Sequence, residues 1–167
     1  MLSNCKRKAV LAIGTISIVF IGIFVGLCIY TASYNKGFTS GMKYDKSQGQ
    51  AKYYSCENGM VYRYKAKKPW DLSCFASVCD EKAEYMMINS EGDLVTDGMT
   101  MVLYIWPDKN SYVYGLDFYE CDDEFIQEQV TCNGDWSSLD NELVKKYYDE
   151  IVVLMEAANK KWNLDSK

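Results

Sequence analysis

Residues 9–30 read AVLAIGTISIVFIGIFVGLCIY, an uninterrupted run of 22 residues without a charge. At about 1.5 Å of rise per residue, a helix of this length reaches about 33 Å, enough to cross a hydrocarbon core of about 30 Å. The apolar region of a cleaved signal peptide is shorter, about 7–15 residues. We therefore expect an uncleaved transmembrane signal-anchor helix, and we work outward from it.

The flanks of this run predict its orientation. Residues 1–8 form a short tail with three consecutive basic residues at 6–8, whereas the lysines after the run are more widely spaced. Because positive charge is retained on the cytoplasmic side, we expect a cytoplasmic N-terminus and an extracytoplasmic, periplasmic or extracellular C-terminal domain. Tyr30, Tyr34 and Phe38 are expected to form an aromatic collar at the outer interface.

A small-residue pair lies inside the predicted span. Gly22 and Gly26 are four residues apart, a spacing that lets two helices approach closely in lipid. Thr15 lies close to the same face, and Gly14 lies two steps back along the same row, which Ile18 interrupts. This face predicts either association with a second copy or docking onto another membrane subunit. The other interpretation is that glycine is simply common in membrane helices.

The chain beyond the span changes character. Residues 31–52 are rich in Gly, Ser, Lys and Gln without an apolar period, which predicts a flexible tether. Residues 53–167 are expected to form one folded domain. The segment after residue 33 holds all 23 acidic residues and 15 of the 18 basic ones, a net charge of −8. This charge argues against nucleic acid and is compatible with a basic protein partner.

The middle of the domain predicts an antiparallel sheet. Asn58-Gly59 is the dipeptide best suited to a type I′ turn and predicts a hairpin of strands 52–57 and 60–66. Pro107 begins a turn between strands 100–106 and 111–119. Further strands are expected at 84–89, 94–95 and 124–131, whereas 71–82 is ambiguous between a short helix and a loop. The signals add up to a meander of about five to seven strands.

The C-terminal part has the period of a helix. Apolar residues recur at intervals of three and four, which predicts a long amphipathic helix over 138–163. Ser137 and Asp140 have the spacing of an N-terminal capping box. The helix is expected to pack on one face of the sheet, so the predicted fold class is α+β. The residues of the apolar stripe are Leu139, Leu143, Tyr147, Ile151, Leu154, Ala158 and Trp162.

Five cysteines follow the span, at Cys56, Cys74, Cys79, Cys121 and Cys132. An oxidising compartment makes them disulfide candidates, with one left over. The favoured set combines Cys121–Cys132 or Cys56–Cys121 with Cys74–Cys79, but the connectivity is not deducible from sequence. Their spacings do not fit a zinc site.

Catalytic signals are weak. The chain contains no histidine, so the usual general base near neutral pH and the imidazole metal ligand are both missing. No phosphate-binding loop, nucleophile elbow or zinc-protease motif occurs. We therefore expect a protein that is not an enzyme and has neither cofactor nor metal. The candidate residues for partner binding are Tyr104, Trp106, Tyr112, Tyr114, Glu120, Asp122 and Asp123.

Together these features predict a single-pass, membrane-anchored, non-enzymatic module that binds a protein at the cell envelope, of the immunity, inhibitor or superinfection-exclusion type. The alternative is an accessory single-pass subunit of a larger membrane complex, docked through the small-residue face of its transmembrane helix. A third interpretation is an envelope enzyme that depends on carboxylates.

Overall fold

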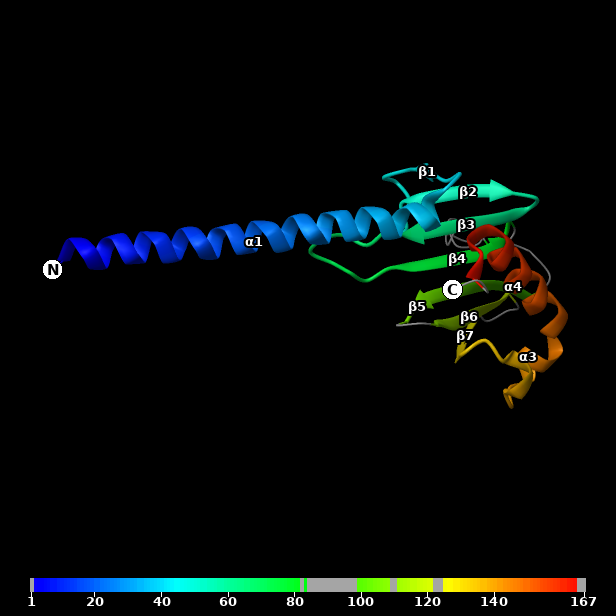
Figure 1. Cartoon of the computed structure of the whole chain (residues 1–167). Coiled ribbons are helices and arrows are strands. Elements are labelled where there is room, and N and C mark those ends of the chain that lie inside the picture. Colours follow the sequence, from blue (N-terminus) through cyan, green and yellow to red (C-terminus); the bar gives the residue numbers. More distant parts are fainter. Residues whose placement is uncertain (1, 82, 84–98, 109–110, 122–124, 165–167) are drawn as a thin grey trace. The chain divides into compact units, whose positions relative to one another are not determined.

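The computed structural model describes residues 2–81, 83, 99–108, 111–121 and 125–164. The chain divides into two compact units, Met1–Gly37 with Lys67–Ser73, and Phe38–Ala66 with Cys74–Lys167. The first unit is built on one long helix, and the second contains a sheet and the C-terminal helices (Figure 1).

The long helix, α1, runs from Leu2 to Thr39 and contains the predicted span. It is the one helix in the described part of the chain that is long and apolar enough to cross a membrane. The hydroxyl side chains of Ser17 and Thr31 donate to the carbonyls of Ile13 and Leu27, each at 2.9 Å. These polar groups therefore find partners on the helix itself, as an apolar environment requires.

The second unit contains a seven-stranded antiparallel sheet in which every strand pairs with its neighbours in sequence. The structure confirms the predicted α+β class and the predicted antiparallel meander. Asn58 (φ 55°) and Gly59 (φ 76°) form the turn between the second and third strands, as their sequence predicts. The strands are β1 Lys43–Tyr44, β2 Tyr53–Glu57, β3 Met60–Lys65, β4 Phe75–Asp80, β5 Met99–Pro107, β6 Tyr112–Cys121 and β7 Phe125–Cys132.

Strand β4 corrects the reading of residues 71–82 as a helix or loop. Residues 76–79 are buried at four successive positions, so the strand is covered on both faces. A strand of this kind carries no alternation of polar and apolar residues, and its sequence signal is lost. The strands expected at 84–89 and 94–95 lie outside the described residues.

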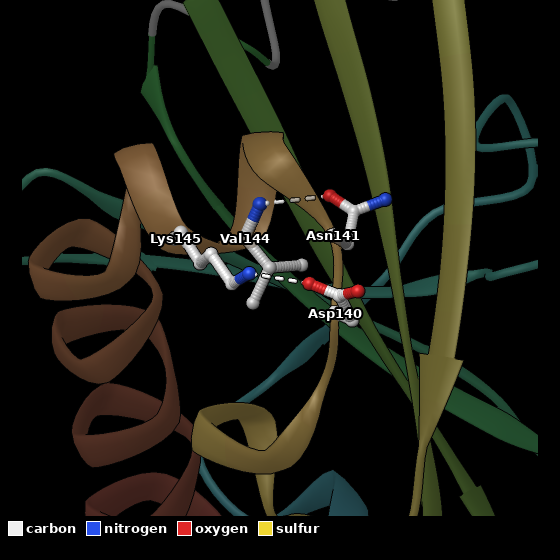
Figure 2. Close-up of polar contacts among 4 residues, drawn as sticks. All are labelled: Asp140, Asn141, Val144 and Lys145. Carbon is white, nitrogen blue, oxygen red and sulfur yellow. Dashed lines mark hydrogen bonds and ion pairs between the residues drawn. The ribbon is translucent and has the colours of Figure 1, made fainter.

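The C-terminal helix is broken rather than continuous. A 3-10 turn, η1 (Trp136–Ser138), is followed by α3 (Glu142–Lys146) and α4 (Tyr148–Trp162), with the break at Tyr147 (φ −111°, ψ 27°). The cap is also displaced from the predicted position. Asn141, and not Ser137, accepts a hydrogen bond from the Val144 amide at 2.9 Å, as Figure 2 shows.

Helix α4 packs on one face of the sheet, against β4 and β5 (Figure 1). Ile151, Leu154, Ala158 and Trp162 are buried, which confirms the C-terminal half of the predicted stripe. The N-terminal half differs, because in α3 the buried residue is Val144. We call the side of the sheet that contacts α4 the helix face.

Part of the segment 31–52, predicted to be a flexible tether, lies in regular elements, since α1 continues to Thr39 and β1 spans Lys43–Tyr44. Phe38, near the end of α1, is only 1% exposed and stacks on Tyr64 with the ring centroids 4.8 Å apart. The Trp162 indole donates to the Phe38 carbonyl at 3.1 Å. Phe38 is therefore a core residue of the second unit and not part of an exposed collar. The core position of Phe38 was not predicted, because a single aromatic residue in a polar segment creates no period.

Candidate functional site

The side of the sheet opposite α4 carries a row of polar and aromatic side chains, and we call it the groove face. Tyr62 and Tyr64 of β3 contact Trp162 and Phe38, so Arg63 between them points to the opposite side. Arg63 pairs with Ser77, Ser77 with Tyr104, and Tyr104 with Gly115 on successive strands. Four strands thus contribute neighbouring positions to this face.

A groove of about 510 Å³ lies on the groove face. The sheet supplies Arg63, Phe75, Ser77, Val102 and Tyr104, and residues 47–51 supply the other wall. That wall is held in shape by a turn in which the Asp45 carboxylate accepts hydrogen bonds from the Ser47 amide and hydroxyl. Both bonds hold the pKa of the Asp45 carboxyl below its ordinary value.

Three aromatic rings form a continuous surface beside the groove. Phe75 meets Tyr104 edge to face at 6.0 Å, and Tyr104 stacks on Trp106 at 5.7 Å with 11° between the ring planes. The Trp106 ring lies directly over Gly115, where an added Cβ would come within 2.5 Å of it. The missing side chain at Gly115 is therefore what allows Trp106 to lie against the sheet.

A buried carboxylate organises the tyrosines next to this surface. Asp117, which is 6% exposed, accepts hydrogen bonds from the Tyr119 hydroxyl at 3.1 Å and the Gln129 amide at 2.7 Å. Burial raises the pKa of the Tyr104 phenol, with a further contribution from Asp117. The pKa of Tyr119 is raised by burial, and also by Tyr104 and Asp117. Both phenols are therefore neutral at ordinary pH, and the Tyr119 hydroxyl donates a hydrogen bond to the Asp117 carboxylate.

This arrangement suits binding by stacking and hydrogen bonding. The rings of Phe75, Tyr104 and Trp106 offer apolar area, Arg63 offers a fixed positive charge, and Ser77 offers a hydroxyl. Among the described residues, no three or more Cys, Asp or Glu side chains lie close enough together to hold a metal ion.

The predicted aromatic set divides between the two faces. Tyr104 and Trp106 lie on the groove face and are partly exposed. Tyr114 pairs with Ile105 on the helix face, is only 8% exposed, and contacts Tyr112 at 6.3 Å. The structure therefore does not bring these four residues together, because β5 and β6 pair in a register that sets the two tyrosines of β6 on the other side.

The predicted acidic cluster is not described in full. Glu120 lies on β6 opposite Met99 and Ile126, and its side chain is outside the described part. Asp122 and Asp123 lie outside the described residues.

The structure shows no disulfide among Cys28, Cys56, Cys74, Cys79 and Cys132, the cysteines whose side chains it describes. Cys79 lies within β4 and Cys74 immediately precedes this strand, so their separation in an extended chain is about 16 Å. The Cα atoms of a bridged pair lie within about 7 Å. The predicted Cys74–Cys79 bridge is therefore wrong.

The other favoured bridges also fail on strand geometry. Cys132 pairs with Tyr114, whereas Cys121 pairs with Phe125 at the other end of the β6–β7 hairpin, about 23 Å away. Cys56 lies on β2, and three strands separate it from Cys121 on β6, a distance of about 19 Å across the sheet. The Cys56 thiol instead donates to the Glu81 carboxylate.

The small residues of the predicted helix-packing face lie on α1. A Cβ added at Gly14, Gly22 or Gly26 would meet no atom within 4 Å. Thr15 lies on the same helix. These positions are neither confirmed nor contradicted as a contact site.

Sequence reasoning missed Arg63, Phe75 and Ser77, three of the residues that line the groove. Two of them lie on β4, the strand that was read as a helix or loop. The run Phe75–Asp80 carries only a weak strand signal, because it holds one aromatic and one β-branched residue and does not alternate.

Comparisons with protein-family models, with curated proteins and with solved structures found no match to this chain.

Proposed function

We propose that this protein is a membrane-anchored, non-enzymatic module that binds a protein partner through the groove face. The observation that carries the proposal is the contiguous aromatic surface of Phe75, Tyr104 and Trp106 beside the groove. Among the described elements, helix α4 does not cover this surface, since it packs on the helix face.

The chemistry of the surface supports recognition of a protein. Tyrosine and tryptophan supply large contact areas at a low cost in conformational entropy and are enriched where proteins bind one another. The net charge of −8 after residue 33 favours the approach of a basic partner. Arg63 then provides one point at which a carbonyl or carboxylate of that partner is bound.

The exposed surface of α1 supports the anchor. Ile13, Phe20, Phe24 and Ile29 are each half or more exposed, and such a continuous apolar surface is unfavourable in water. Insertion into a bilayer removes it from water. In this proposal the basic residues at 6–8 stay in the cytoplasm and the domain lies outside, at the cell envelope. An immunity, inhibitor or superinfection-exclusion role fits a small anchored binding module.

A second candidate function is that of an accessory subunit or homodimer held together within the membrane. The open space around Gly22 and Gly26 in the single chain favours it, since close helix approach needs that space. Exchange of both glycines for isoleucine is expected to abolish crosslinking to a second chain. Unchanged crosslinking would exclude this contact.

The groove-face proposal is tested by affinity purification from native membranes with the full chain. Trp106→Ala is expected to lose the protein that co-purifies with the wild type, because it removes one third of the aromatic surface. Tyr148→Ala, at an exposed position of α4, is the matched control and is expected to retain it. Equal recovery with both variants would contradict the proposal, as would failure of the wild type to retain any protein.

A further inference from the structure

The segment Lys67–Ser73, which joins β3 to β4, belongs to the same compact unit as most of α1 and runs beside that helix (Figure 1). We call it the 67–73 loop. The Asn35 side chain fixes its first residue, donating to the Lys67 carbonyl at 2.8 Å and accepting from the Lys67 amide at 2.9 Å. Because the Asn35 amide bonds both the backbone N–H and the backbone C=O of Lys67, it fixes the point at which the loop begins.

Lys67 also fixes the position of the loop along the axis of α1. Its ammonium group lies 3.6 Å from the centroid of the Tyr34 ring and 3.3 Å from the Tyr30 hydroxyl. Tyr30 is the last residue of the uncharged run. The loop is therefore attached at the level where the apolar part of α1 ends.

The tip of the loop is a closed turn that presents apolar side chains outward. The Lys68 amide donates to the Asp71 carbonyl at 2.7 Å, and the Asp71 amide returns a bond of 3.0 Å to the Lys68 carbonyl. Trp70, between them, is 75% exposed, and Leu72 is 47% exposed. These two bonds fix the backbone of the turn that carries Trp70, and Leu72 follows the turn directly.

We infer that the 67–73 loop is a second membrane contact, which seats Trp70 and Leu72 in the headgroup region of the bilayer beside α1. The inference rests on the proposed transmembrane role of α1. Tryptophan favours the interface, where its ring is among acyl chains and its N–H remains hydrated. Lys67 and Lys68 lie where lipid phosphates are, and lysines near a bilayer surface are attracted to anionic lipids.

The bilayer is favoured over a protein as the occupant because the loop continues the surface that α1 already presents to lipid. The Lys68 and Asp71 amides are bonded within the turn, which lowers the cost of bringing this backbone into an interfacial region. With two contacts instead of one, the unit that α1 forms with the 67–73 loop has a defined orientation at the membrane surface.

The test uses the full chain in vesicles of phosphatidylcholine and phosphatidylglycerol that contain lipids brominated near the top of the acyl chain. Bromine quenches tryptophan fluorescence only at short range. Trp70→Phe is expected to remove more than half of the quenching seen in the wild type. Trp106→Phe, in the other compact unit, is the matched control and is expected to retain it.

Carbonate extraction of the same vesicles separates this inference from the proposed anchor. A chain that stays in the membrane, with quenching lost in Trp70→Phe alone, supports the loop contact. A chain that stays in the membrane with equal quenching in wild type and Trp70→Phe overturns the loop contact and leaves the anchor intact. A chain that carbonate releases overturns the anchor and the loop contact together.

Discussion

Phe38 is the residue whose removal tests most sharply how α1 ends. It is fully buried in the second unit, stacked on Tyr64, and its carbonyl accepts the Trp162 indole N–H. Replacement of a buried phenylalanine by alanine costs about 3–5 kcal/mol. The stacked pair contributes about 0.5–1.5 kcal/mol beyond its buried area. We therefore expect Phe38→Ala to lower the free energy of unfolding by about 4 kcal/mol, about a thousandfold in the equilibrium constant.

Urea unfolding of the full chain in lipid nanodiscs, followed by tryptophan fluorescence, measures this change, since Trp162 lies 6.2 Å from Phe38 between ring centroids. Phe20→Ala is the matched control, because Phe20 lies on the same helix and is 68% exposed. It is expected to change the unfolding free energy by less than about 0.5 kcal/mol. The same small effect from Phe38→Ala would refute the packing of Phe38 in the core of the second unit.

Three further changes address the groove face and the helices. Gly115→Ala is expected to displace the Trp106 ring and to cost about 1–3 kcal/mol, read from urea unfolding and from the shift in Trp106 emission; an unchanged spectrum would refute the close contact. Asn141→Ala is expected to cost about 1 kcal/mol, and Ser137→Ala clearly less, because only Asn141 caps α3; equal costs in calorimetry would contradict this. Folding raises the pKa of Tyr119, so the buried neutral phenol contributes fully to the free energy of unfolding below pH 10.0, and this contribution is lost as the pH rises further. Tyr119→Phe is expected to flatten that alkaline loss in a pH series of unfolding midpoints, and an unchanged slope would assign the loss elsewhere.

Local signals predicted the parts of the fold that they govern. Asn58 and Gly59 adopt the positive φ values that a type I′ turn needs, and this turn fixes the register of β2 and β3. The apolar period of α4 predicted four buried residues, because an amphipathic helix needs only one face to be apolar.

Packing between residues far apart in the chain decides the two features that the sequence did not predict, strand β4 and the core position of Phe38. Strand β4 is buried on both faces, so its neighbours, and not its pattern, define it. Phe38 is a core residue only because Tyr64 and Trp162 reach it from distant positions in the chain.

The predictions of the disulfide bridges and of the aromatic binding set failed for a related reason. A short separation in sequence suggested the Cys74–Cys79 bridge, but an extended strand carries the two residues apart. The register of β5 and β6 decides which face each aromatic residue occupies, and so it separates Tyr104 from Tyr114. The groove was therefore not deducible before β4 had been placed.

The central claim is that the groove face binds a protein while the chain is anchored in a membrane. A photoreactive benzoylphenylalanine in place of Phe75 tests it directly, with the same residue in place of Tyr148 on α4 as the control. The account predicts a discrete covalent adduct with one protein from position 75 in native membranes and no such adduct from position 148. The absence of an adduct from position 75, or the same adduct from both positions, would contradict it.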